Sequence, residues 1–289
     1  MTRWPTRAVR RAGGGLLAVL WLSSSPALAD RTNHLFLDET QLVPEGDVEL
    51  QQWVWAQGQI PSLSRDHGNY YSTYYTTGWV WFGPTVGISS HLELSLPLVV
   101  VATPEQTVLN SISLVARYRF FSREQDDGFQ PLIRVEYQQP LSNYTAGTYT
   151  YSSGSGSYSY NYAYPNPPEL KVLLAATYGG LTGVRATLNV GVQLGLAFLQ
   201  SSSTASFSAL GTAGLGLSVP LGSEFRVAAE LDGQVPLAGV PEAPNLAQLF
   251  LGPSVAWTRG QIWVTFGSLF GLTQNSNRFL PKVLWGITF

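Results

Sequence analysis

The sequence contains no cysteine. The protein therefore forms no disulfide, has no thiolate nucleophile and carries no lipid-modified N-terminal cysteine. A small exported domain often depends on disulfides, but the roughly 260 residues that follow position 29 are enough to bury a core or close a barrel without them.

Basic residues are also scarce outside the N-terminal region. Four of the 16 lysines and arginines lie within the first 29 residues, at Arg3, Arg7, Arg10 and Arg11, which leaves 12 against 18 acidic residues and a net charge of −6 for the rest. Proteins that bind nucleic acids present a basic surface to the phosphates. We therefore expect no nucleic-acid partner.

Long apolar runs are absent as well. The apolar stretch near the N-terminus, Gly13–Leu22, is shorter than the ~20 residues that a membrane-spanning helix needs. It stands between the basic residues and the small-residue motif "ALA" that precedes Asp30. This order predicts a secretory signal peptide over residues 1–29, cleaved after Ala29. The pair of arginines at 10 and 11 could belong to a twin-arginine signal, but an ordinary basic region is the simpler interpretation.

The remaining sequence alternates between apolar and polar residues with a period of two. In residues 184–198, for example, Leu188, Val190 and Val192 alternate with Asn189 and Gln193. Alternation of this kind predicts strands rather than helices. Such strands are expected over residues 47–57, 76–87, 91–101, 107–121, 130–140, 169–178, 183–199, 207–219, 224–235, 246–257, 261–270 and 279–289. Alternation alone fits either a soluble sandwich or a membrane barrel.

Loop lengths and aromatic residues favour the barrel. Long connections, such as 58–75 and 141–168, alternate with short turns, with the charged stretch 122–129 as the exception, and outer-membrane barrels sort their loops in this way. Aromatic residues cluster near strand ends, where rings are expected at the level of the lipid headgroups. These residues are Trp53, Trp55, Trp79, Trp81, Phe82, Trp257, Trp263, Phe266, Phe270, Trp285 and Phe289. Glycines inside the strands would allow the wall to curve.

The last residues, "VLWGITF", place Val283, Trp285, Ile287 and Phe289 on one side of an extended strand. This pattern resembles the signal that the bacterial barrel-assembly machinery recognises. The sequence thus predicts an all-β, closed antiparallel up-and-down transmembrane β-barrel of about 12 strands over residues 47–289, in the outer membrane of a Gram-negative cell and in contact with its lipid. Residues 30–46 are expected to form a periplasmic N-terminal segment, either a tail or a piece folded into the lumen.

If the apolar positions face lipid, the alternate positions line the lumen. This set has mixed charge and comprises Glu49, Glu93, Arg117, Arg119, Arg134, Glu136, Lys171, Arg185, Arg226, Glu230, Asp232 and Lys282. Buried charges must pair or stay hydrated. They form either salt bridges that fill the barrel or a polar path for a small solute, and the narrow lumen expected of twelve strands allows both.

A tyrosine-rich stretch occupies one long connection. Six tyrosines alternate about a Ser/Gly centre, which predicts a hairpin above the membrane; they are Tyr149, Tyr151, Tyr158, Tyr160, Tyr162 and Tyr164. Tyr, Ser and Gly also compose adaptable binding surfaces, so this loop is either a mobile surface loop or a contact site for a ligand, a sugar or a phage.

No catalytic or metal-binding pattern is apparent. Outer-membrane phospholipases with twelve strands use a serine, histidine and asparagine triad, but His34 lies in the N-terminal segment, His67 in a loop and His91 in a turn, none beside a plausible nucleophilic serine. No carboxylates accompany these histidines at ligand spacing, and no glycine-rich phosphate motif occurs. We expect neither an enzyme nor a cofactor or metal.

Two strands carry a family resemblance. "SSHLELSLPLVV", residues 89–100, and "FRVAAELDGQVPL", residues 225–237, each resemble an acidic alternating strand that ends near a proline in the family of outer-membrane transporters named for phenol-degradation (MetA) pathways. The resemblance implies passage of small, hydrophobic or aromatic molecules and carries over no ligand residue. We expect a passive channel or transporter for small solutes; the alternative is a structural or adhesive surface protein with a plugged lumen.

Overall fold

The computed structural model describes residues 33–58, 64–66, 69–71, 76–103, 106–121, 128–142, 144–153, 156–164, 168–180, 183–198, 205–238, 247–273 and 276–289. The predicted signal peptide and His67 lie outside these residues. The described part contains no helix that is both long and apolar enough to cross a membrane.

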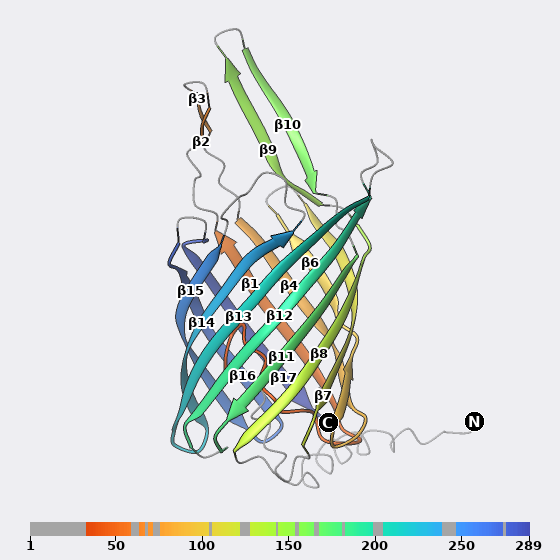
Figure 1. The fold of residues 1–289 in the computed structure, drawn as a ribbon, viewed down its shortest axis with the longest axis vertical. Helices are drawn as coiled ribbons and strands as arrows, with labels where there is room; N and C mark the ends of the chain where they lie inside the picture. The colour runs from red at the N-terminus through yellow and green to blue at the C-terminus, as the bar shows by residue number, and fades with distance from the viewer. Residues whose placement is uncertain are drawn as a thin grey trace, which may run out of the picture.

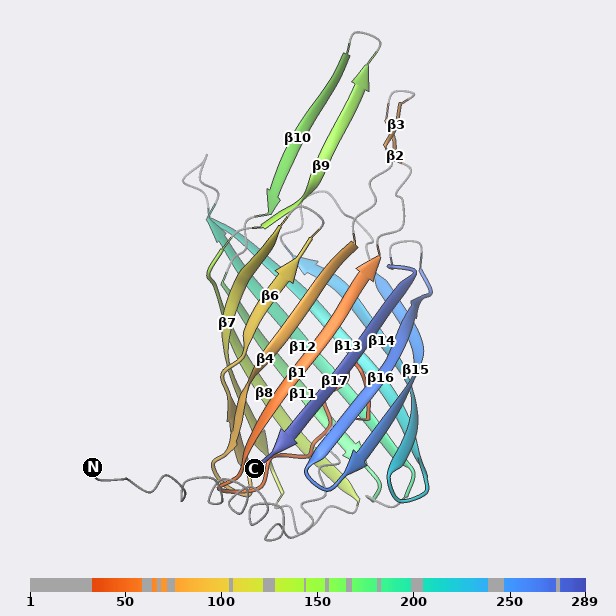
Figure 2. The same cartoon turned by 180° about the vertical axis from the view of Figure 1, so that it is seen from behind.

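Thirteen of the described strands form a closed antiparallel barrel (Figures 1 and 2). Strand β1 pairs with β17 on one side and with β4 on the other, and this double pairing closes the sheet. The order of the wall follows the chain, so that each strand pairs with its neighbours in sequence. The wall strands are β1 (Val48–Gly58), β4 (Thr76–Gly87), β5 (Leu92–Ser95), β6 (Leu98–Ala102), β7 (Thr107–Arg119), β8 (Phe129–Pro140), β11 (Glu169–Tyr178), β12 (Arg185–Phe198), β13 (Ala205–Leu221), β14 (Phe225–Ala238), β15 (Gln248–Arg259), β16 (Ile262–Gly271) and β17 (Phe279–Thr288).

Strands β5 and β6 are two halves of one wall strand, so the barrel has twelve strands, as predicted. The prediction of one continuous strand over residues 91–101 is therefore wrong, because β5 ends at Ser95 and β6 begins at Leu98. The chain breaks at Leu96 and Pro97 and bends over Gly83 of β4, where an added Cβ would lie 2.5 Å from Pro97 Cα. Proline has no N–H to donate to the sheet, so a strand that contains it is expected to bend or end there.

The alternation of residues separates two faces of the wall. On β12, Leu188 and Val190 are 51% and 52% exposed on the outside, whereas Thr187 and Asn189 are buried inside. The apolar parity therefore faces outward, and the polar parity faces the lumen. A barrel with this arrangement needs an apolar surrounding for its outer face.

The two ends of the barrel differ in their connections. Short turns lie at the end that holds the C-terminus, and two of them reverse at Gly222 and Gly260, whose φ angles of 85° and 60° favour glycine. At the other end, strands β9 (Tyr144–Ser153) and β10 (Gly156–Tyr164) form the predicted tyrosine-rich hairpin, which extends beyond the barrel (Figure 1). A smaller pair, β2 (Ser64–Asp66) and β3 (Asn69–Tyr71), lies at the same end.

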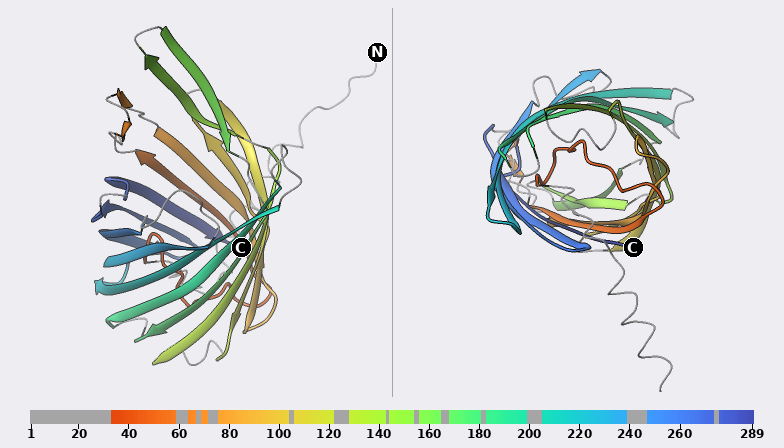
Figure 3. Two further views of the ribbon diagram at one scale, coloured as in Figure 1. Left: turned by 45° about the horizontal axis from the view of Figure 1, so that its top comes forward. Right: turned by 90° about the horizontal axis from the view of Figure 1, so that it is seen from below.

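The described residues 33–45, which precede β1, run inside the barrel (Figure 3). We call residues 33–45 the lumenal segment. It leaves the lumen beside the end of β4, where Gly46 N donates to Gly87 O at 2.9 Å, and it turns into β1 at Gly46 with a φ of 83°. The sequence left two alternatives for residues 30–46, a periplasmic tail or a piece folded into the lumen, and the described residues 33–45 take the second, held there by buried hydrogen bonds to the wall.

Candidate functional site in the barrel lumen

Wall carboxylates bind the backbone of the lumenal segment. Glu230 of β14 accepts hydrogen bonds from Leu35 N at 2.7 Å and Phe36 N at 2.9 Å. Glu93 of β5 accepts a hydrogen bond from Val43 N at 2.7 Å. Hydrogen bonds to ionised groups are stronger than neutral ones. The hydrogen bonds to Glu230 and Glu93 satisfy backbone N–H groups of the lumenal segment, which forms no strand or helix and would otherwise leave these groups unpaired inside the barrel.

Wall cations bind the carbonyl groups of the same segment. Lys282 Nζ of β17 donates to Leu35 O at 2.5 Å, and Arg117 Nη1 donates to Gln41 O at 3.2 Å. Arg117 also donates to Glu39 O. Donors and acceptors on opposite parts of the wall therefore hold the segment from both sides.

Asp38 is the centre of one charged cluster. Its Oδ2 accepts from Arg134 Nη1 at 2.9 Å, and its Oδ1 lies 3.7 Å from Arg117 Nε. Arg117 also pairs with Glu93 at 2.8 Å, and Arg134 with Glu136. Burial alone would raise the pKa of Asp38, but Arg134 and Arg117 more than offset it and hold that pKa below its usual value. Asp38 is therefore ionised at neutral pH.

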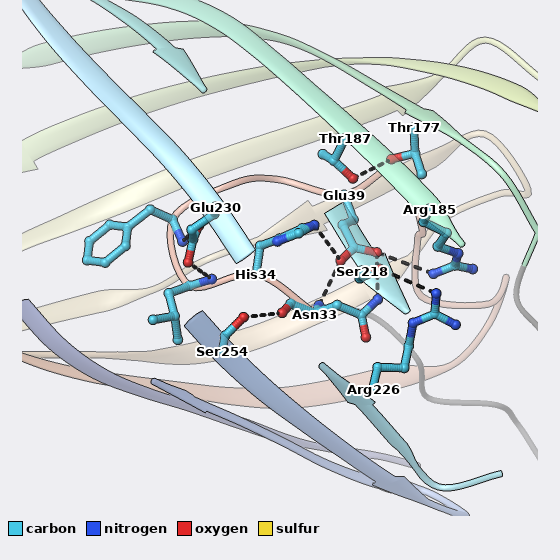
Figure 4. Close-up of polar contacts among 12 residues, drawn as sticks. Asn33, His34, Glu39, Thr177, Arg185, Thr187, Ser218, Arg226, Glu230 and Ser254 are labelled. Atoms are coloured by element: carbon cyan, nitrogen blue, oxygen red, sulfur yellow. Dashed lines mark hydrogen bonds and ion pairs between the residues drawn. The ribbon is translucent and has the colours of Figure 1, made fainter. Parts of the chain in front are cut away.

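Glu39 is the centre of a second cluster, shown in Figure 4. Its carboxylate accepts from Asn33 N at 2.7 Å and lies 3.3 Å from Arg185 Nη1 of β12. His34 Nε2 is 3.9 Å from Glu39 Oε1. Burial lowers the pKa of His34 to about 4, Glu230 opposes this shift, and Arg226 and Arg185 add to it. The imidazole is therefore neutral at pH 7, and its contact with Glu39 is not an ion pair.

Two glycines of β13 make room for this part of the segment. A Cβ at Gly214 would lie 2.2 Å from Leu37 Cδ2, and one at Gly216 would lie 2.4 Å from His34 Cε1. The glycines inside strands were expected to let the wall curve. At these two positions their role is to let the lumenal segment approach the wall.

Stacked tryptophans line another side of the lumen. Trp53 stacks on Trp81 with ring centroids 4.3 Å apart, and Trp55 stacks on Trp79 at 5.6 Å. Lys282 Nζ lies 4.7 Å from the ring centroid of Trp53, within the range of a cation–π contact. Since these rings lie on the same side of the wall as lumenal Lys282, the prediction that they sit at the headgroup level is wrong.

The same correction applies to Trp263, which is 2% exposed and packs with Leu35 and Leu284 inside the barrel. By contrast, Phe82, Phe266, Phe270 and Phe289 are exposed on the outside.

Two cavities flank the lumenal segment. One of about 60 Å³ is bounded by Trp53, Trp81 and Arg117. The other, of about 160 Å³, is bounded by polar side chains that include Asn189 and Gln193. Phe36, Asp38 and Arg134 line both cavities. This part of the segment therefore separates two spaces of the lumen.

The predicted lumenal residues all lie on the inner face of the wall, and each is buried or half-buried. Sequence reasoning missed the residues that bring them together, namely Phe36, Asp38 and Glu39. Of the predicted assembly signal, Val283 and Phe289 are exposed on the outer face, whereas Leu284 between them is 1% exposed inside. The side chains of the six tyrosines in the hairpin lie outside the described part of the structure.

The two described histidines have different surroundings. His91 is in a turn, where its Nδ1 is 2.9 Å from Arg119 O, while His34 is in the lumen. Within the residues that the structure describes, no three His, Asp or Glu side chains gather as a metal site would require.

No family model and no curated protein sequence matches the chain. Among solved structures, an outer-membrane channel from Pseudomonas putida F1 is 10% identical, with 87% of this chain and 98% of that chain covered and a TM-score of 0.57. The translocator domain of the autotransporter NalP from Neisseria meningitidis is 15% identical over 84% of this chain and 88% of that chain, with a TM-score of 0.53. The β domain of the Bordetella autotransporter BrkA is 13% identical over 84% and 99%, with a TM-score of 0.50. At these identities the likeness establishes the barrel fold.

Proposed function

We propose that this protein is an outer-membrane channel for small solutes, and that its lumenal segment controls passage. The observation that carries the proposal is the pair of cavities that meet at Phe36 and Asp38. A barrel filled only for stability has no need of solvent-sized spaces on both sides of a short inserted segment. The segment is the element whose displacement would join them.

The outer face supports the membrane location. Large apolar side chains such as Leu174, Leu188 and Leu217 are each more than half exposed on the wall. Soluble proteins rarely expose a continuous apolar surface of this kind, whereas barrels in lipid require it. On this proposal the end with short turns faces the periplasm, the hairpin end faces outward, and the barrel-assembly machinery inserts the chain.

The solute class follows from the lumen and from two resemblances. Trp53 and Trp81 give one cavity an aromatic wall. The solved structure from Pseudomonas putida F1 is described as an outer-membrane channel. Together with the resemblance to transporters of phenol-degradation pathways, this wall supports small solutes with an apolar or aromatic part.

Planar-bilayer recording of the refolded protein tests the proposal. We expect discrete conductance steps, and a larger or more frequent open state when residues 33–45 are deleted. Heat-modifiable gel mobility of each protein serves as the folding control. A barrel that is folded by this criterion but silent with and without the segment would overturn the channel function.

A second candidate is a structural or adhesive surface protein. The bonds from Glu230, Glu93 and Arg134 to the segment, and the hairpin of β9 and β10 beyond the barrel end, favour it. This role predicts a silent barrel that binds cells or glycans and loses that binding when residues 144–164 are removed.

A further inference from the structure

We propose that the lumen binds a small carboxylate with an aromatic or apolar body at the place that Phe36 and Asp38 now occupy. The inference rests on the proposed channel function and names its solute class. In this view the lumenal segment fills its own binding site, and a solute competes with it.

The charges around the first cavity carry the argument. Among the residues that line it, the barrel wall contributes three cations, Arg117, Arg134 and Lys282, against one carboxylate, Glu93. The lumenal segment contributes the other two carboxylates, Asp38 and Glu39. Glu136, which pairs with Arg134, reduces this excess of wall cations. When the segment moves away, the three cations still outnumber the two wall carboxylates, and the remaining positive charge attracts an anion.

The wall around the second cavity also contributes more cations than carboxylates. Its charged lining from the wall is Arg134, Lys171 and Asp232, and the segment again adds Asp38. Lys171 is paired with Glu169 and Glu136 of the wall at 3.4 and 3.7 Å, so the cations that Asp38 compensates are Arg134 and Arg117. A solute carboxylate at that position would compensate the same two arginines.

The contacts of Asp38 are those of a bound carboxylate. One oxygen lies 2.9 Å from Arg134 Nη1 and the other 3.7 Å from Arg117 Nε. Arginine matches the geometry of carboxylates better than lysine does, and such pairs are strong in a partly desolvated site. The two arginines come from adjacent strands and stand opposite each other in the register of β7 and β8.

The ring of Phe36 occupies the place that the apolar body of the solute would take. This ring lies with its centroid 4.3 Å from Lys282 Nζ and packs against the buried residues Leu35, Trp263 and Leu284. Lys282 also lies near the ring of Trp53. The wall thus accepts an aromatic ring and, from a residue two positions further along the segment, a carboxylate, so a solute that carries both groups would find partners for each.

Benzoate tests the inference, with benzyl alcohol and benzylammonium as uncharged and cationic analogues of similar size. Binding is measured by quenching of tryptophan fluorescence and by block of current through the refolded protein. We expect benzoate to act at a concentration at least tenfold lower than either analogue. Acetate, which lacks the ring, should act only at a concentration higher than that of benzoate.

Two variants and one control make the test specific. Asp38→Asn removes the competing charge but leaves both arginines, so the benzoate concentration for half-maximal effect should fall about tenfold. Arg134→Gln should raise it about tenfold or more. Arg259→Gln changes the exposed pair with Glu224, outside the lumen, and should leave it unchanged.

The outcomes separate the two proposals. If folded wild type and Asp38→Asn protein both conduct but respond equally to benzoate and benzyl alcohol, the carboxylate site is overturned and the channel stands. If neither conducts but fluorescence reports preferential benzoate binding that Asp38→Asn strengthens, the site stands and the channel is overturned. Should Arg134→Gln fail to fold, an unchanged benzoate affinity in Asp38→Asn is sufficient to overturn the site.

Discussion

Gly216 of β13 lies directly against the imidazole of His34, and an added Cβ would be 2.4 Å from His34 Cε1. The backbone of β13 and the ring of His34 are therefore in close contact, with no room for a further atom between them. A residue 182 positions away in the sequence sets how closely the segment approaches the wall. This contact shows that the segment is fitted to the barrel and does not merely lie within it.

Gly216→Ala should push the segment away from β13. Overpacking of a closely packed site costs roughly 1–3 kcal/mol, which we expect as a lower free energy of unfolding together with faster proteolysis of residues 33–45. Gly183→Ala is the matched control, because the nearest atom to a Cβ there is 4.0 Å away. Equal proteolysis of the two variants would contradict the close fit.

Glu230→Gln should loosen the start of the lumenal segment. The change keeps the size of the side chain but replaces the carboxylate that accepts hydrogen bonds from Leu35 N and Phe36 N. Hydrogen bonds to charged groups contribute about 1.5–3 kcal/mol to stability. Hydrogen exchange of these two amides should become about tenfold faster or more. Glu45→Gln, in the same segment but exposed, should leave it unchanged. Unaltered exchange in Glu230→Gln would mean that other contacts hold the segment.

The strands of the wall could be predicted because each one repeats a two-residue pattern. Strands β4 and β11 begin and end at the predicted residues, Thr76–Gly87 and Glu169–Tyr178. The same pattern placed the charged residues on the lumenal face. It continued across Leu96 and Pro97, however, so the break between β5 and β6 was not apparent from alternation alone.

The lumenal site was harder to predict because its contacts join distant parts of the chain. Leu35 and Glu230 are 195 residues apart, and no local pattern records such a pair. For Trp53 the information was present, since it shares the parity of Glu49 on β1, but its position near a strand end suggested the membrane surface instead. Parity is the better guide to the facing of an aromatic residue in a barrel wall.

Arg117→Ser combined with Arg119→Ser should change ion selectivity. Arg119 is buried on the lumenal face and Arg117 lines the smaller cavity, so their removal takes positive charge from the lumen, and the anion-to-cation permeability ratio should fall about twofold or more. The reversal potential in a salt gradient measures this ratio. Arg259→Ser, at an exposed position, provides the control. Unchanged selectivity in a conducting double variant would argue that the current does not pass these residues.

Single cysteines can test the facing of the wall without background, because the natural chain has none. Leu188→Cys should react with a lipid-soluble maleimide in vesicles, since Leu188 is half exposed on the outer face. Asn189→Cys should resist that reagent, because Asn189 lines the larger cavity inside. The opposite labelling of these neighbours would contradict the barrel in lipid.

Acidification should destabilise the barrel through His34. Its pKa is about 4 in the folded protein against 6.5 for the ordinary side chain, because it is buried and because Arg226 and Arg185 lie near it, with Glu230 opposing the shift. The unfolded chain therefore binds more protons between these two values, and the stability that neutral His34 contributes is present above pH 6.5 and is lost as the pH falls toward 4. The loss amounts to about 3 kcal/mol, at about 1.4 kcal/mol for each unit.

Urea unfolding in lipid vesicles between pH 4 and pH 7.5 measures this contribution, by comparison of wild type with His34→Gln. The difference in free energy of unfolding between the two proteins should depend on pH only within that window, because the glutamine does not titrate. Ionisable groups that do not interact with His34 contribute equally to both proteins and cancel in the comparison, whereas Glu230 is coupled to His34 and its contribution is included in the difference. His91→Gln, in the turn beside Arg119, is the control, and this variant should lose stability on acidification through His34 as the wild type does. A difference between wild type and His34→Gln that stays constant from pH 7.5 to pH 4 would show that His34 is not held neutral in the lumen.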